Sequence, residues 1–276
     1  MSDHTPETSS SQPVPSGATE LAHVDLTGAR LHRVQLVDAR FRMVDLTGAL
    51  MRDVSLEGAS IDGVIDGLTI NGVEVGPYVE AELARRTPAR ALRRATDPAG
   101  LREAWAAIEG AWDASHARVA AMPAGTTELS VEDEWTYTQT LRHLVLATDA
   151  WLGAVLAAVT GVELPFHPWG MAFSEMHEFV EEVDRLGLDH DATPTYAQVR
   201  EVRADRVARV RAFLADVTPE VLAGPCPGPM WESGDHLGVL RCLRVILNEE
   251  CEHLRYAERD LDLLEAGHPT TPPPAH

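Results

Sequence analysis

The sequence predicts an α+β protein in two parts, a short coiled solenoid at the N-terminus and a four-helix bundle after it. Two observations support this fold class. A bulky apolar residue returns every five positions through the first quarter of the chain, and four later stretches have the length and the capping residues of bundle helices. We therefore expect the first part to follow a period of five and the second to follow helical periodicity.

The repeat of five is the most regular pattern in the chain. Its bulky positions are Leu21, Leu26, Leu31, Leu36, Phe41, Leu46, Met51, Leu56 and Ile61. Two residues before each of these, from Leu26 onward, stands a small residue that alternates between valine and alanine. A period of five fits neither a helix nor a strand. If both sets point inward, the chain turns a quarter of the way round at each pentad, and four pentads form one square coil.

These pentads, such as LTGAR at 26–30 and LTGAL at 46–50, resemble the pentapeptide-repeat family. The resemblance implies a right-handed quadrilateral β-helix, which we place at residues 19–77, with short strands closing it within residues 65–79. Nine pentads make little more than two coils, only about 10 Å of stacked strands, which is too short to imitate a DNA duplex. Residues 1–18 are rich in Ser, Thr and Pro and are expected to be a disordered tail.

The bundle is predicted over residues 97–267, after a connector at residues 78–96 with a helix from Tyr78 to Arg86. Polar N-caps and early prolines mark the helix starts. The four helices are expected from Asp97 to about Met122, from Ser130 to about Thr160, from Thr193 to about Asp216, and from about His236 to Glu265. The proline-rich residues 268–276 are expected to form a second disordered tail.

Composition excludes several classes of function. A net charge of −20 argues against a nucleic-acid backbone or an anionic membrane as partner. The chain has no lysine, which excludes Schiff-base and P-loop chemistry. Three cysteines are too few for a disulfide framework, and Cys242 and Cys251 are expected to be buried. With no signal peptide or membrane span evident, we expect a cytoplasmic protein.

One pattern could bind a metal ion. Glu249 and His253 are four residues apart, so they share one face of the last predicted helix, and His143 lies on the second. One histidine from one helix and such a pair from another make a three-ligand site with open positions. From the residues alone, a core histidine is the commoner role for a residue placed like His143, and a solvated ion pair is the commoner role for Glu249 with His253. Glu250 and Glu252 are expected to be ordinary surface acids.

Two segments, EWTYTQTLRHLVLATDAW at 134–151 and CLRVILNEECEHLRYAERDL at 242–261, resemble the second and fourth helices of the DinB-like superfamily (DinB_2 type). The resemblance implies a four-helix bundle with up-down-down-up topology, and a family of metal-dependent thiol transferases and a glutathione- or mycothiol-dependent isomerase. The family's metal triad falls on His143, Glu249 and His253, with Glu249 where the family usually has histidine. Such a set still binds zinc, nickel, manganese or ferrous iron, and it favours harder metals than three imidazoles would.

By this resemblance we expect a metal-dependent enzyme, a thiol S-transferase by type, that activates a low-molecular-weight thiol such as mycothiol, or water, for transfer to a small electrophile. No catalytic protein residue is assigned. His167, Trp169 and His236 are candidates for the substrate pocket, with plain loop packing as the alternative. Arg241 and Arg244 could serve an anionic substrate or simply be solvated. The alternative function is a non-catalytic interaction or ligand-binding protein that uses the solenoid for docking or for homodimer formation.

Overall fold

The computed structural model describes residues 21–171, 185–189, 191–231 and 237–272. It divides into two units, residues 1–62 and 63–276, each of which is described by itself. The tail predicted at residues 1–18 and the predicted start of the last helix at His236 lie outside the described residues.

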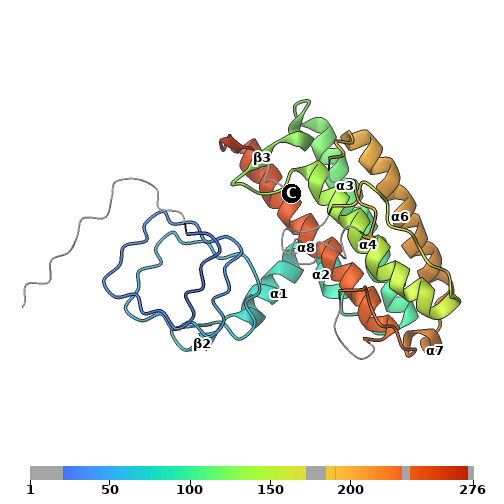
Figure 1. The fold of residues 1–276 in the computed structure, drawn as a ribbon, viewed down its shortest axis with the longest axis horizontal. Helices are drawn as coiled ribbons and strands as arrows, with labels where there is room; N and C mark the ends of the chain where they lie inside the picture. The colour runs from blue at the N-terminus through green and yellow to red at the C-terminus, as the bar shows by residue number, and fades with distance from the viewer. Residues whose placement is uncertain (1–20, 172–184, 190, 232–236, 273–276) are drawn as a thin grey trace, which may run out of the picture. The chain divides into compact units, whose positions relative to one another are not determined.

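In the first unit the backbone turns with the period of the sequence. The left-handed conformation recurs at every fifth residue, at His23, Gly28, Arg33, Asp38, Met43, Gly48, Asp53 and Gly58. Every second turn is closed by a hydrogen bond from an alanine amide to the carbonyl three residues earlier, as from Ala29 to Leu26 at 2.9 Å. Figure 1 shows this blue segment winding round in successive coils. The pentad is thus the unit of turning, as the sequence predicts.

The predicted β-helix is not confirmed by the described part of this unit. Residues 21–62 contain no β-strand, and the bulky residues of the repeat remain exposed, from 50% at Leu46 to 69% at Leu21. The physical reason lies in the backbone pairing, because the hydrogen bonds found within residues 21–62 close turns and do not join one coil to the next. Without such bonds the coils do not form the ladders that define a sheet.

The second unit begins with a small hairpin and two short helices. Strands β1 (Thr69–Ile70) and β2 (Val73–Glu74) pair in antiparallel fashion around Asn71 and Gly72, which both have positive φ, as an Asn-Gly turn favours. Short strands are therefore present within residues 65–79, as expected. Helices α1 (Gly76–Arg86) and α2 (Pro88–Leu92) form the connector.

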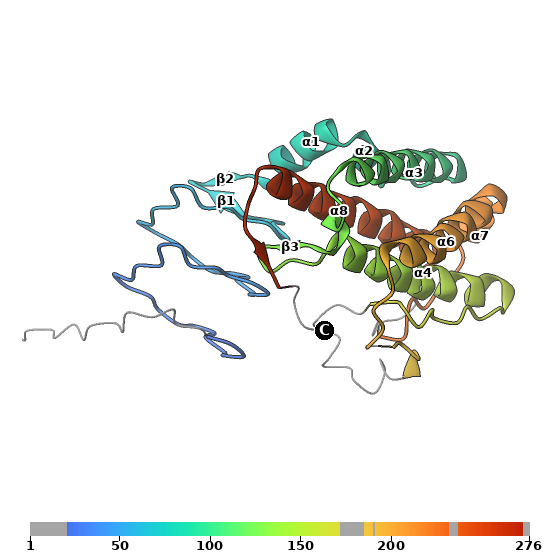
Figure 2. The same cartoon turned by 90° about the horizontal axis from the view of Figure 1, so that it is seen from above.

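Four long helices lie side by side in the second unit (Figures 1 and 2). They are α3 (Pro98–Ala121), α4 (Tyr137–Thr160), α6 (Tyr196–Asp216) and α8 (Val239–Glu265), with the short helices η1 (Thr126–Glu128) and α7 (Pro219–Leu222) between them. Helix α4 packs against both α6 and α8. By length and composition alone α4 could cross a membrane, but 67% of its most apolar stretch is buried inside the bundle, which is typical of a core helix.

The starts of α3, α4 and α6 are set by polar caps. Asp97 accepts hydrogen bonds from the first amides of α3, and Thr136 and Thr195 form capping boxes with Gln139 and Gln198 at the starts of α4 and α6. The predicted start of the second helix at Ser130 is therefore wrong by seven residues, since α4 begins at Tyr137. The third helix begins at Tyr196 rather than at Thr193, and within the described residues the last helix begins at Val239.

The reason for the late start of α4 is a strand pair that joins distant parts of the chain. Strand β3 (Ser130–Val131) pairs with β4 (Thr270–Thr271), and Thr271 Oγ1 accepts a hydrogen bond of 2.9 Å from the amide of Asp133. The prediction of a disordered tail from residue 268 is thus wrong for the described residues 268–272.

The core of the bundle is apolar and also contains two buried ion pairs. Large apolar side chains from α3, α4 and α8 fill it, among them Leu101, Ile108, Leu144, Leu152, Leu247 and Leu261. Cys242 and Cys251 are buried as expected. Asp149 on α4 pairs with Arg206 on α6, and Glu250 on α8 pairs with Arg203 on α6. The prediction that Glu250 is a surface acid is wrong, because its side chain is 1% exposed.

Candidate metal centre

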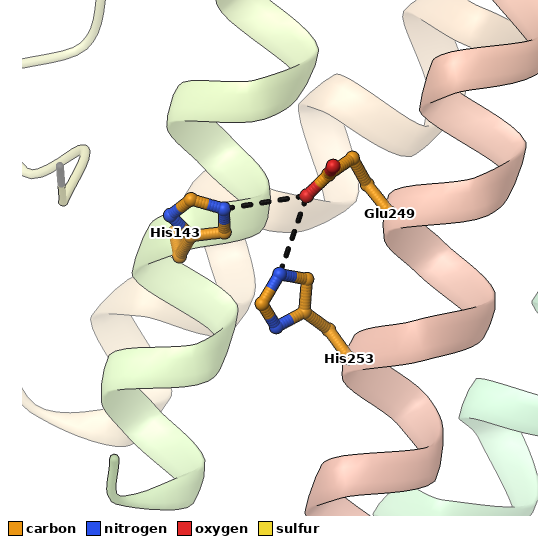
Figure 3. Close-up of side chains that lie close together, drawn as sticks. All are labelled: His143, Glu249 and His253. Atoms are coloured by element: carbon orange, nitrogen blue, oxygen red, sulfur yellow. Dashed lines mark hydrogen bonds and ion pairs between the residues drawn. The ribbon is translucent and has the colours of Figure 1, made fainter. Parts of the chain in front are cut away.

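Three side chains from α4 and α8 meet between the two helices (Figure 3). His143 comes from the second turn of α4, and Glu249 and His253 stand one turn apart on α8. The Oε2 atom of Glu249 lies 3.4 Å from His143 Nε2 and 3.2 Å from His253 Nε2. The three residues that the sequence singles out are therefore brought together around one carboxylate oxygen.

The orientation of His143 is fixed by its second nitrogen. His143 Nδ1 lies 3.1 Å from the carbonyl oxygen of Met171, and a carbonyl only accepts hydrogen bonds. We infer that Nδ1 carries the proton, which leaves the Nε2 lone pair directed toward Glu249. A backbone carbonyl that holds the far nitrogen of a histidine is a frequent companion of metal-binding imidazoles.

The donor atoms fit a divalent metal ion. One atom from each of the three residues lies within 4.8 Å of the others. Neighbouring ligands of one ion, with bonds of about 2.1 Å, stand roughly 3.0–3.4 Å apart in octahedral or tetrahedral geometry. The two separations from Glu249 Oε2, 3.2 and 3.4 Å, are of this size.

The surroundings shift the pKa values of two of the three side chains, Glu249 and His253. Burial raises the pKa of Glu249, but its contacts with His143 and His253 outweigh burial and hold that pKa far below its usual range. Burial lowers the pKa of His253, and the hydrogen bond to Glu249 opposes this only in part. At neutral pH the site therefore offers an ionised carboxylate beside a neutral His253, as metal binding requires.

Aromatic rings pack around the two imidazoles. The ring of Trp135 is stacked on His253 at 5.9 Å between centroids and lies 4.9 Å from the ring of His143. The ring of Tyr256 meets His253 edge-on at 5.6 Å. Sequence reasoning missed Trp135 as part of the site. The available signal was its position directly before Thr136, the N-cap residue of α4. An N-cap fixes the direction in which the chain enters the helix, and so it places the residue before it.

Two of the candidate pocket residues, His167 and Trp169, lie beside α4 and contact its residues Asp149 and Arg142. The backbone amide of His167 donates to Asp149 at 2.8 Å, and its ring lies 5.1 Å from that of Trp169. The carbonyl of Trp169 accepts a hydrogen bond of 2.9 Å from Arg142, the residue before His143. His236 lies outside the described residues. A role of His167, Trp169 and His236 in the substrate pocket thus stays a prediction.

Comparison with known protein families agrees with the geometry. A family model described as the DinB superfamily matches residues 107–257, more than half of the 276-residue chain. A model of pentapeptide repeats matches eight copies across residues 18–53 and 29–65. Searches of the curated proteins and of the solved structures found no significant match. The chain therefore belongs to the DinB superfamily, whose members are metal-binding, and it carries pentapeptide repeats in addition to a His/Glu/His cluster.

Proposed function

We propose that this protein is a metal-dependent enzyme of the DinB type, a thiol S-transferase that acts in the cytoplasm on a small electrophile. The observation that supports it is the convergence of His143, Glu249 and His253 on one point between two helices. Three ligands leave coordination positions open, as catalytic metal sites do. The cosubstrate we propose is a low-molecular-weight thiol such as mycothiol, with water as the alternative nucleophile.

The three ligands limit which metal ions the site would bind. Two imidazoles and one carboxylate suit zinc, nickel, manganese or ferrous iron, and the carboxylate favours the harder ions of that group. Exchanging Glu249 for histidine would give the ligand set that is usual in the resembling family. We expect Glu249→His to shift the bound metal toward zinc or nickel and away from manganese.

The chain's own residues would prepare the site in three ways. Met171 holds the imidazole of His143 through Nδ1, so its Nε2 atom is aimed before any ligand arrives. Glu249 supplies one negative charge in a largely buried position, and Trp135 covers the imidazole of His253. A bound metal ion would supply the lowered pKa of a coordinated thiol or water.

A second role is proposed for the repeat segment. Its apolar side chains are exposed in the described residues, among them Leu21, Leu31 and Phe41 at 62–69%. We propose that the segment is a docking or dimerisation face, and that its coils adopt the quadrilateral β-helix of the resembling family when that face is covered. The protein would then be a homodimer. The alternative function, a non-catalytic interaction protein, rests on this face alone.

The decisive experiment is elemental analysis of the full chain purified without a polyhistidine tag. We expect close to one equivalent of divalent metal in the wild type and a large loss in Glu249→Ala, His143→Ala and His253→Ala. Glu201→Ala is the matched control, because Glu201 is exposed on α6. Metal that stays bound when all three ligands are alanine would refute the assignment. Consumption of a small thiol with a model electrophile, lost in the same variants, would then test the transferase reaction.

A further inference from the structure

A second cleft, separate from the metal centre, opens beside the first half of α8. It has a volume of about 610 Å³, which is within the range of small-molecule sites. Its walls come from the end of α2, from the residues around the end of α7, and from α8. The residues that line it include Arg93, Arg94, Arg241, Arg244, Asn248 and four apolar side chains, Leu222, Leu237, Leu240 and Val245.

The cleft lies on a different face of α8 from the metal ligands. Arg241, Arg244 and Asn248 follow one another at spacings of three and four, so they form one stripe of the helix. Glu249, the next residue, points about 100° further round the helix. The metal ligands face α4, whereas the stripe with Asn248 faces Arg93 at the end of α2, which donates to Asn248 Oδ1 at 3.1 Å. A ligand in the cleft would therefore be distinct from one at the metal.

Positive charge gathers in this cleft although the whole chain has a net charge of −20. Four arginines line it, and one carboxylate, Glu80, serves two of them, at 2.6 Å from Arg93 and 3.9 Å from Arg94. Within the part of the chain that the structure describes, neither Arg241 nor Arg244 is held by an ion pair or a side-chain hydrogen bond. Two guanidinium groups are thus available to an incoming anion.

The backbone adds to this positive field. Helix α8 begins at the cleft, and its N-cap Gly238 offers no side-chain acceptor to the first amides of the helix, of which that of Val239 donates to the carbonyl of Gly224 at 3.1 Å. The helices α3, α4 and α6 each have such an acceptor in their cap residue. The N-terminal end of a long helix favours negative charge, and phosphate above all. It strengthens here the field that Arg241 and Arg244 provide.

We propose that this cleft binds a small organic phosphate. Its phosphate group is held by Arg241 and Arg244, with Arg94 at the rim, because planar guanidinium groups match phosphate oxygens in pairs. Its organic part lies against Leu237, Leu240 and Val245. A phosphate with close to two negative charges fits two arginines without carboxylate partners better than a single carboxylate does.

Calorimetric titration of the full chain with phenyl phosphate tests the proposal. We expect millimolar or tighter binding by the wild type, and a weakening of about tenfold or more in the double variant R241Q/R244Q, since charge-assisted hydrogen bonds are lost. The matched control is R209Q/R211Q, which removes two exposed arginines of α6 that pair with Asp205 and Glu109 and should bind as the wild type does. Circular dichroism confirms that each variant is folded.

Four further titrations complete the test. Inorganic phosphate and phenol should each bind more weakly than phenyl phosphate, because each lacks one half of the ligand, and benzoate should bind more weakly because it has a single charge. Glu249→Ala should bind phenyl phosphate as the wild type does, which separates this site from the metal centre. Unchanged binding in R241Q/R244Q, no binding of phenyl phosphate, equal binding of any of the three partial probes, or loss of binding in Glu249→Ala would overturn the proposal.

Discussion

Replacing Asp149 by alanine should destabilise the bundle far more than the loss of an exposed ion pair. The Asp149 carboxylate is fully buried and receives two hydrogen bonds from Arg206, from Nε at 2.9 Å and from Nη2 at 3.1 Å. It also accepts the backbone amide of His167 at 2.8 Å. The substitution removes all three contacts and leaves the Arg206 charge without this partner, with its side chain only 10% exposed.

The expected loss of unfolding free energy depends on the Arg206 charge that remains after Asp149 is removed. Breaking a buried pair by removing one partner costs about 3–5 kcal/mol in the free energy of unfolding. Because Arg206 Nη1 keeps its ion pair with the half-exposed Asp205 at 3.1 Å, we expect a loss at the lower end of that range, about 3 kcal/mol. Replacing both partners with apolar residues, as in Asp149→Leu with Arg206→Met, removes both charges and leaves mainly the unpaired amide of His167, at about 1–3 kcal/mol. The double variant should therefore be more stable than the single variant, whereas additive losses would make it less stable.

Urea unfolding followed by circular dichroism measures these differences. Arg209→Met is the control, since its pair with Asp205 is about half exposed and is worth at most about 1 kcal/mol. A loss below about 1 kcal/mol in Asp149→Ala would show that water or another group compensates Arg206. A double variant as unstable as the single one would refute the reasoning, because it would place the cost in packing rather than in charge.

Three other predictions concern the helix bundle and the repeat segment. Burial lowers the pKa of His116 to about 4, so the stability gained from its neutral form is present above pH 6.5 and lost as the pH falls from there toward 4. Urea midpoints between pH 7 and 4 should fall less steeply in His116→Gln, and equal slopes would contradict this. Thr136→Ala removes the capping box of α4 and should cost about 1 kcal/mol by urea unfolding, whereas Thr136→Ser should be nearly neutral. Deleting residues 1–62 should leave the metal content per chain unchanged, and an unfolded remainder by circular dichroism would show that the bundle depends on them.

The helices could be predicted where the signal is local. Asp97 before Pro98 marks the start of α3 correctly, because a cap acts on amides two and three residues away. At Ser130 the same logic fails, since Ser130 is buried in a strand that pairs with Thr271. A partner more than a hundred residues away leaves no local pattern, so the sequence does not show that Ser130 belongs to a strand, whereas the capping box of Thr136 and Gln139 is a local signal for the true start of α4.

The candidate site could likewise be predicted from the sequence only in part. A spacing of four places Glu249 and His253 on one face of a helix from sequence alone, but their meeting with His143 depends on how α4 packs against α8. The carbonyl of Met171 comes from a segment without periodicity, so nothing in the sequence indicates it, whereas Trp135 is marked only by its position before the N-cap Thr136. The sequence places Glu250 on the surface because its partner, Arg203, belongs to another helix and leaves no local signal.

The separation of the metal ligands along the chain has a consequence for biosynthesis. His143 and Glu249 are 106 residues apart, and α8 is the last long helix of the bundle. At ribosomal rates of about 5–20 residues per second, His143 waits roughly 5–20 s before its partners exist. During that interval a single imidazole on an unfinished bundle is a poor ligand for any metal ion. Under the proposed function, metal loading would therefore wait until α8 has been synthesised and docked.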